Sequence, residues 1–144
     1  MKVLRAIHTG YGFVVFSLVF ALLLPFLLVP IIDKRQFHLV GIINRIWAKV
    51  VLALVALPWK AELRSPLDPK RQYIFCPNHF SYIDIPTLGL NPVNAVFVGK
   101  SEMEGIPLFG WMYRNLHITV DRTKLKSKYA TLVKSLEALD KGKS

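Results

Sequence analysis

The sequence predicts an α/β fold: a partial mixed sheet with flanking helices, preceded by an N-terminal membrane helix and an interfacial amphipathic helix. Two observations support this fold class. The stretch from Tyr11 to Ile32 contains no charged side chain, and short apolar runs alternate with helical patterns from Lys60 onward. We therefore expect membrane-anchoring helices in residues 1–59 and a soluble domain in residues 60–144.

The charge-free stretch is long enough to cross a bilayer. Its roughly 22 residues, rising about 1.5 Å each, would cover the hydrocarbon core. A secretory signal peptide is the competing interpretation, because Lys2 and Arg5 precede the run. The run is longer than the apolar part of such a signal, and no small-x-small cleavage site precedes Asp33. An uncleaved membrane helix is therefore predicted.

The next apolar segment, from Phe37 to Trp59, has an amphipathic pattern. Its polar residues His38, Arg45 and Lys49 recur at helical spacing and share one stripe. Such a helix suits the membrane interface, with its basic stripe toward the lipid headgroups. A buried helix of a soluble core, a membrane span and a re-entrant hairpin stay open as alternatives. Basic residues flank both ends of the first run, so they do not fix its orientation.

The chain carries a formal net charge of +10, from 19 Lys and Arg against 9 Asp and Glu. Basic chains bind phosphates, so nucleic acid and an anionic membrane surface are both candidate partners. The apolar N-terminal third favours the membrane, and no nucleic-acid-binding motif accompanies the charge. The single Cys76 excludes an intrachain disulfide and a cysteine metal cluster, and it is typical of a reducing compartment.

Three short apolar runs after Lys60 are bounded by turn formers or charge, as strands are. They predict strands at Tyr73–Cys76, Ala95–Val98 and Leu116–Val120. Because helical patterns separate these runs, the region is expected to form a layer of strands covered by helices.

A last helix is predicted from Leu125 to Leu139, followed by Gly142 as a C-terminal signal. One face of this helix carries the apolar residues Tyr129, Leu132, Val133, Leu136 and Leu139. A series of strands and helices that stops on a helix leaves a sheet edge uncovered. We therefore expect a fragment, or a domain that something else completes.

The segment with the clearest chemical potential follows the first predicted strand and reads Asn78-His79-Phe80-Ser81-Tyr82-Ile83-Asp84. In open α/β sheets, ligands gather at the carboxyl ends of strands. If His79 lies in a loop before a helix that starts near Asp84, the carboxylate can reach the imidazole and fix its tautomer for proton abstraction. Pro86 agrees with this placement, because proline is tolerated in a first helical turn.

The surrounding residues limit what this pair could do. Cys76 falls within a predicted strand and Ser81 is too close to His79 in sequence, so no activated nucleophile is evident. The pair therefore suits deprotonation of a substrate hydroxyl better than a covalent enzyme intermediate. Ser81-x-x-Asp84 also fits a capping box, in which Asp84 only supports the start of the helix.

Several motifs occur in a family-like order. Asn78-His79-x-Ser81-x-x-Asp84 resembles the first conserved block of the lysophospholipid acyltransferases, the family of the 1-acylglycerol-3-phosphate acyltransferases. The resemblance continues with Lys100-Ser101-Glu102-Met103, with Ile106-Pro107-Leu108-Phe109-Gly110-Trp111, and with Ile118-Thr119-Val120-Asp121-Arg122, which resembles the second block. It implies that residues 60–144 are the N-terminal part of an acyltransferase domain.

The resemblance implies a role for each matching residue. His79 would take the proton from the free hydroxyl of a lysophosphatidate, and that oxygen would attack the thioester of an acyl-carrier protein or acyl-CoA to give phosphatidic acid. Asp84 would orient His79. Arg122, Lys100 and Asn78 would bind substrate, with Arg122 on the acceptor's phosphate.

The resemblance also implies the setting of the reaction. The Ile106–Trp111 stretch would form part of the acyl-chain surface. No metal or cofactor is expected, and the partners would be the lysophospholipid acceptor, the acyl donor and the membrane, with the active site on its cytoplasmic face. His8, His38 and His117 are assigned no role.

Family members carry a third block, Phe-Pro-Glu-Gly-Thr-Arg, soon after a helix like Leu125–Leu139, and this sequence stops before such a block. We therefore expect the chain to lack part of the phosphate pocket and a central strand. A truncated, non-catalytic membrane or lipid-binding protein is the alternative function.

Overall fold

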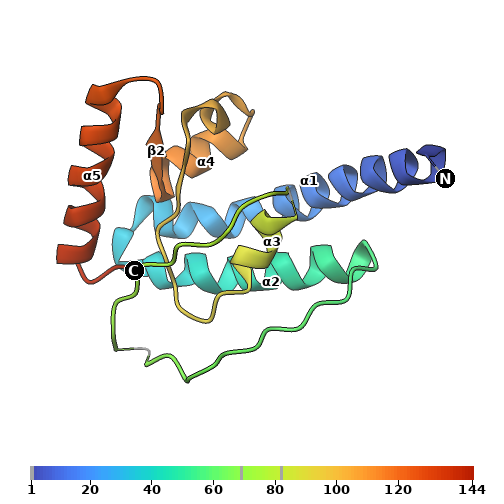
Figure 1. Ribbon diagram of the computed structural model, residues 1–144, viewed down its shortest axis with the longest axis horizontal. Coiled ribbons are helices and arrows are strands. Elements are labelled where there is room, and N and C mark those ends of the chain that lie inside the picture. Colours follow the sequence, from blue (N-terminus) through green and yellow to red (C-terminus); the bar gives the residue numbers. More distant parts are fainter. Residues whose placement is uncertain (1, 69, 82) are drawn as a thin grey trace.

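The computed structural model describes residues 2–68, 70–81 and 83–144. Figure 1 shows two long helices, α1 and α2, lying side by side, with α4, β2 and α5 gathered around one end of the pair. The elements in chain order are α1 (Lys2–Ile32), a 3-10 turn η1 (Lys34–Phe37), α2 (His38–Leu54), α3 (Asp84–Gly89), β1 (Val98–Lys100), a 3-10 turn η2 (Ser101–Gly105), α4 (Phe109–Leu116), β2 (Ile118–Val120) and α5 (Leu125–Asp140).

Helices α1 and α2 form a hairpin whose inner faces are apolar. The turn between them starts at Asp33, whose side chain accepts a hydrogen bond from the backbone N–H of Arg35 at 3.0 Å. The ring of Phe16 meets the ring of Trp47 edge-on, with centroids 4.7 Å apart. The buried side chains of this contact are Val15, Val19, Trp47, Ala48, Val51 and Val55.

Two helical stretches, Lys2–Ile32 and Lys34–Leu54, are long and apolar enough to cross a membrane by length and composition. Large apolar side chains of α1 lie exposed along its length, among them Leu4, Leu18, Leu22 and Phe26. This surface is compatible with membrane association, as the sequence predicts for the first helix.

Helix α2 is shorter than the predicted segment Phe37–Trp59. It ends at Leu54 because the backbone turns into the left-handed region at Ala56, with φ of 54°, shortly before Pro58. One residue of the basic stripe makes hydrogen bonds within the protein. Arg45 Nη1 donates to the carbonyl oxygens of Asn91 and Pro92, both at 3.2 Å. The interfacial position of α2 stays a prediction.

The second half of the chain rests on this hairpin through α4. The buried side chains of Met112 and Leu116 pack with Leu27 of α1 and with Val40 and Ile43 of α2. The ring of Phe109 lies 5.4 Å from that of Phe20 on α1. The hairpin and α4 therefore share one apolar cluster.

The sheet is smaller than the sequence predicts. Its two described strands, β1 and β2, are parallel, with Val98 opposite Ile118 and Lys100 opposite Val120. They correspond to the predicted runs Ala95–Val98 and Leu116–Val120, shifted by a few residues. The mixed character expected for the sheet is absent from these two strands.

The predicted strand Tyr73–Cys76 is wrong. The segment belongs to no strand, and Cys76 is exposed rather than enclosed in a sheet. The physical reason is the lack of a ladder partner, because a strand exists only where a neighbouring backbone pairs with it.

Helix α5 lies where the sequence predicts it, but its apolar face is not the buried one. Tyr129, Leu132 and Leu136 are all more than half exposed. The helix instead docks on β2 through Thr131, which is buried and whose hydroxyl donates to the carbonyl oxygen of Thr119 at 3.1 Å. A small side chain lets the helix approach the strand closely.

Candidate active site

The site begins with a contact between a loop histidine and the first residue of a helix. The extended segment that contains Asn78 leads into His79, and Asp84 opens α3. The Nδ1 atom of His79 lies 3.0 Å from the Oδ2 atom of Asp84. The side chains are 58% and 25% exposed, so a substrate can reach the imidazole ring while the carboxylate is partly covered.

The same carboxylate oxygen accepts two backbone hydrogen bonds. The N–H groups of Phe80 and Ser81 donate to Asp84 Oδ2 at 2.7 and 2.8 Å. These backbone donors, Ser81 first and then Phe80, hold the pKa of the Asp84 carboxyl below its usual value of 3.8, and the contact with His79 lowers it further. Asp84 is therefore a fixed anion beside the ring.

Only one of the two hydrogen bonds of a capping box forms between Ser81 and Asp84. Ser81 N–H does donate to the Asp84 carboxylate, but Asp84 N–H donates to the carbonyl oxygen of Ser81 instead of its hydroxyl. The Ser81 hydroxyl accepts from Ile83 N–H at 3.3 Å. Asp84 thus orders the start of α3 and contacts the imidazole with the same oxygen.

This geometry has a chemical consequence for the imidazole. An anionic acceptor beside Nδ1 favours the tautomer that carries its hydrogen there, which leaves the Nε2 lone pair of His79 free to take a proton. Asp84 would then stabilise the positive charge that develops on the ring. The arrangement is that of a general base.

Lys100 and Arg122 lie at the carboxyl edge of the sheet. Lys100 is the last residue of β1 and pairs with Val120, and Arg122 follows β2 by two residues. Both side chains are exposed, as is Asn78 beside His79. Among the described residues, no hydrogen bond or ion pair joins Lys100, Arg122 or Asn78 to the His79–Asp84 pair.

Asp121, the residue before Arg122, contacts Thr123 and Lys124. The hydroxyl and N–H of Thr123 donate to the carboxylate of Asp121, and Lys124 Nζ lies 3.0 Å from its Oδ2. These contacts, those with Thr123 first, lower the pKa of Asp121 to about 2. The ion pair therefore forms with Lys124, and in the described part of the chain the Arg122 guanidinium has no carboxylate partner.

The Ile106–Trp111 stretch divides between core and surface. The ring of Phe109 stacks on Tyr113 with centroids 5.5 Å apart and also meets α1, whereas Trp111 is 41% exposed. The prediction that the stretch contacts an acyl chain therefore concerns Trp111 and its exposed neighbours rather than Phe109.

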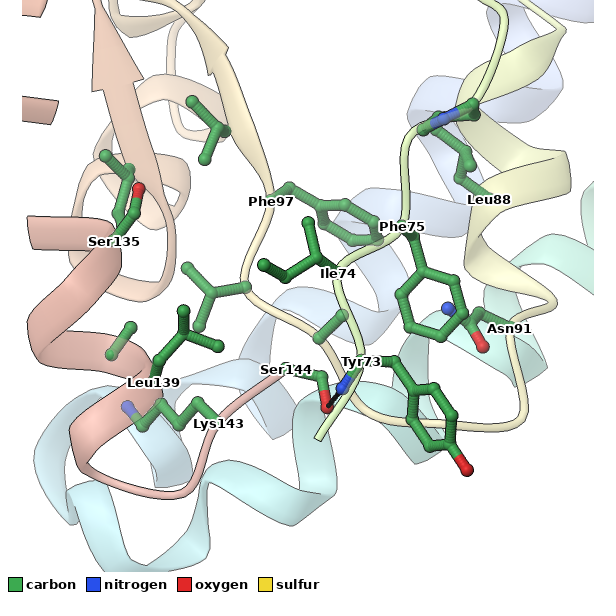
Figure 2. Close-up of a pocket in the computed structure, with 16 residues that line it drawn as sticks. Tyr73, Ile74, Phe75, Leu88, Asn91, Phe97, Ser135, Leu139, Lys143 and Ser144 are labelled. Carbon is green, nitrogen blue, oxygen red and sulfur yellow. Dashed lines mark hydrogen bonds between the residues drawn. The ribbon is translucent and has the colours of Figure 1, made fainter. Parts of the chain in front are cut away.

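An open cavity of about 260 Å³ lies beside the segment that leads to His79 and not around the ring itself. Figure 2 shows Ile74 and Phe75 on one side of it, Phe97 on the other, and Ser144 next to Tyr73. Its wall is mainly apolar. The lining residues are Tyr73, Ile74, Phe75, Pro77, Leu88, Asn91, Ala95, Val96, Phe97, Val98, Ile118, Ser135, Ala138, Leu139, Lys143 and Ser144.

Sequence reasoning missed the backbone N–H groups of Phe80 and Ser81, because any residue types could supply them. It also assigned no role to His117, whose Nδ1 accepts a hydrogen bond from Phe97 N–H at 3.3 Å. Burial, and then the charge of Lys143, lower the pKa of His117 to about 3. This partly buried histidine is therefore neutral near pH 7.

In the residues that the structure describes, no three His, Cys, Asp or Glu side chains come together as a metal site. The described geometry instead places an exposed imidazole beside a carboxylate, and it leaves the side chains of Lys100 and Arg122 exposed. No curated protein and no solved structure matches the chain. A family model described as Acyltransferase matches residues 60–144, which include His79, Asp84, Lys100 and Arg122. Because this match spans more than half of the 144 residues, the chain belongs to the Acyltransferase family.

Proposed function

We propose that the chain acylates a lysophosphatidate, transferring an acyl group from acyl-CoA or an acyl-carrier protein to the free hydroxyl of 1-acylglycerol 3-phosphate. The observation that carries the proposal is the 3.0 Å contact between His79 Nδ1 and Asp84 Oδ2 on an accessible loop. Membership of the Acyltransferase family supports acyl transfer in general, and the order of the motifs favours this acceptor.

The 3.0 Å contact between the two side chains supports the following reaction. His79 Nε2 takes the proton of the acceptor hydroxyl, and the oxygen attacks the thioester carbonyl as Asp84 stabilises the imidazolium. A carbon–oxygen bond forms, the carbon–sulfur bond breaks, and the proton passes from His79 to the departing thiolate. No covalent enzyme intermediate is needed in this step.

The acceptor's phosphate needs cationic partners near this base. Arg122 is the first candidate, because its guanidinium can bind two phosphate oxygens at once and Asp121 is already paired with Lys124. Lys100 is the second, since it ends the adjacent strand. Asn78 would contribute an amide beside His79.

A membrane location follows from the acceptor, whose acyl chain lies in a bilayer. The exposed apolar surface of α1 would hold the protein there, with the His79 loop reaching the headgroups from the cytoplasmic face. The long acyl tail could then stay in lipid while the hydroxyl meets the base.

The test uses the purified chain in detergent–phospholipid micelles with lysophosphatidate and radiolabelled acyl-CoA or acyl-carrier protein. We expect labelled phosphatidate to form, and His79→Ala to reduce its rate by about 10²–10⁴-fold. The matched control is His38→Ala, because His38 is exposed at the start of α2 and far from the loop in sequence. A label released as free fatty acid would show hydrolysis instead of transfer.

Two results would contradict the proposal. A His79→Ala chain that keeps the wild-type rate would remove the base from its role. A wild-type chain that binds lysophosphatidate vesicles but forms no product with either donor would instead support the non-catalytic lipid-binding function.

A further inference from the structure

Helix α5 carries an apolar stripe on its exposed side. The stripe consists of four large side chains that are each more than half exposed: Leu125, Tyr129, Leu132 and Leu136. At about 3.6 residues per turn, they fall within an arc of roughly 60° around the helix. Thr131, through which α5 packs on β2, lies roughly 130° from the centre of that arc. The stripe therefore faces away from the sheet.

Figure 1 shows α5 at the outer edge of the molecule, on the side of β2 away from α4. A continuous apolar stripe on such a helix marks a surface that a partner covers. The stripe residues follow one another at intervals of four, three and four positions. This spacing is that of a coiled-coil seam, so the partner that fits the stripe is another helix.

The charged residues of α5 indicate which helix that is. Lys126 and Lys128 lie in its first half, and Glu137 and Asp140 lie in its second half. All four are exposed, and among the described residues no ion pair engages any of them. A helix with a basic first half and an acidic second half is complementary to a copy of itself that runs in the opposite direction.

An antiparallel pair of α5 helices matches the stripe and the charges in one register. When Leu132 faces Leu136 of the second copy, Tyr129 faces Leu139 of the second copy. In the same register, Lys126 comes beside Asp140 of the second copy. Two-fold symmetry makes each of these contacts occur twice. A parallel pair would instead place each Lys126 beside the other Lys126, where like charges repel.

We propose that two copies of this chain associate through the α5 stripe, with the two helices antiparallel. An anionic bilayer fits the surface less well, because it would attract Lys126 and Lys128 but repel Glu137 and Asp140. An acidic protein would meet the same conflict. The interface is small, so the pairing should depend on protein concentration and should gain from confinement of both copies to one membrane.

Exchanging the charges tests the pairing. Sedimentation equilibrium of the full chain in a nonionic detergent measures the dissociation constant of the dimer. Lys126→Glu and Asp140→Lys, each alone, should raise this constant at least about tenfold, because the lost pair occurs twice and is replaced by repulsion. The double variant restores opposite charges and should return within about threefold of the wild type. Lys134→Glu, on the side of α5 opposite the stripe, is the matched control.

Two results of this experiment would overturn the proposal. One is a wild-type chain that stays monomeric over the whole concentration range. The other is a double variant that dimerises no better than the single variants. Leu132→Asp places a charge in the centre of the stripe and should abolish the dimer. Because Leu132 is exposed, this variant should keep the circular dichroism spectrum and the Tm of the wild-type monomer.

Cysteine cross-linking tests the direction of the helices. In a Cys76→Ser background, Val133→Cys would lie near the two-fold axis of the antiparallel pair and should form a disulfide-linked dimer under mild oxidation. Leu125→Cys should not, because the antiparallel arrangement separates the two copies of this residue. Cross-linking through position 125 and not through position 133 would overturn the antiparallel arrangement.

A lipid contact is a separate outcome. A fluorophore on Leu132→Cys, also in the Cys76→Ser background, reports burial of the stripe at protein concentrations where the chain is a monomer. Burial that appears when phosphatidylglycerol vesicles replace detergent would overturn the proposal in favour of lipid. The stripe contains none of the residues proposed for acyl transfer, so His79→Ala should dimerise like the wild type. Failure of the pairing would therefore leave the proposed function untouched.

Discussion

The Oδ2 atom of Asp84 accepts three hydrogen bonds at once, and one of them comes from Nδ1 of His79. The two backbone donors fix the carboxylate before any substrate arrives. Asp84, whose position the backbone fixes, in turn orients the His79 ring. A general base needs such a fixed orientation to meet a substrate hydroxyl. The role of Asp84 can therefore be tested separately from that of His79.

Asp84→Asn should lower kcat far more than it changes the KM for the acceptor. The amide can still accept from the backbone N–H groups, but it carries no charge to stabilise the imidazolium. We expect kcat to fall by about 10²–10⁴-fold, with KM within about threefold. Steady-state rates with lysophosphatidate measure both, and Asp140→Asn at the exposed end of α5 is the control. An unchanged kcat would limit Asp84 to supporting the helix.

Arg122→Gln should act on the phosphate of the acceptor and not on the chemistry. A lost charged hydrogen bond costs roughly 1.5–3 kcal/mol, or about 10–150-fold in binding. We expect the KM for lysophosphatidate to rise by at least about tenfold, while the reaction with an uncharged monoacylglycerol is unaffected. Lys126→Gln, on exposed α5, controls for general loss of positive charge. Equal effects on both acceptors would contradict a phosphate contact.

The sequence predicted the His79–Asp84 pair because the pair is local. The two are five positions apart in the sequence, and a loop followed by a helix start is enough to bring them together. The strand predicted at Tyr73–Cys76 failed for the opposite reason, since pairing depends on backbone far away in sequence. Lys100 and Arg122 are an intermediate case. The order of the strands predicts that both residues lie at the same edge of the sheet, but the motifs do not predict how far that edge lies from His79.

Burial was harder to predict than helix position. The spacing of Tyr129, Leu132 and Leu136 is that of a core-facing stripe, yet α5 docks through Thr131. Which face of α5 packs against β2 depends on the shape of that strand, and the spacing of apolar residues carries no information about this shape. His117 shows the same limit, because only the fold reveals that a backbone N–H faces its ring.

Gly110→Ala should destabilise the fold although alanine is the better helix former. A β-carbon at Gly110 would lie 2.2 Å from the carbonyl oxygen of Glu104, which is backbone and cannot turn aside. We expect a loss of about 1–3 kcal/mol in the free energy of unfolding and a lower Tm. Gly105→Ala is the matched control, because nothing lies within 4 Å of its added carbon. Similar Tm values for the two variants would contradict the close approach.

His117 should make the protein less stable as pH falls below neutrality. Its folded pKa of about 3 lies below the ordinary value of 6.5, so between these values the unfolded chain binds a proton that the folded chain does not. Stability is therefore full above about pH 6.5 and is lost as pH falls, by about 1.4 kcal/mol at pH 5.5. Asp84 does not contribute in this window, because its lowered pKa matters only below 3.8.

His117→Asn isolates this effect, because an amide oxygen can replace Nδ1 as the acceptor for Phe97 N–H without titrating. Denaturant unfolding of detergent-solubilised protein at pH 7.0, 6.0 and 5.5 should show the variant losing about 1.3 kcal/mol less than the wild type between pH 7.0 and pH 5.5. His38→Asn, on the exposed start of α2, should keep the wild-type dependence. Parallel pH curves for wild type and His117→Asn would mean that the ring gains a proton in the folded state and is not held neutral by its burial.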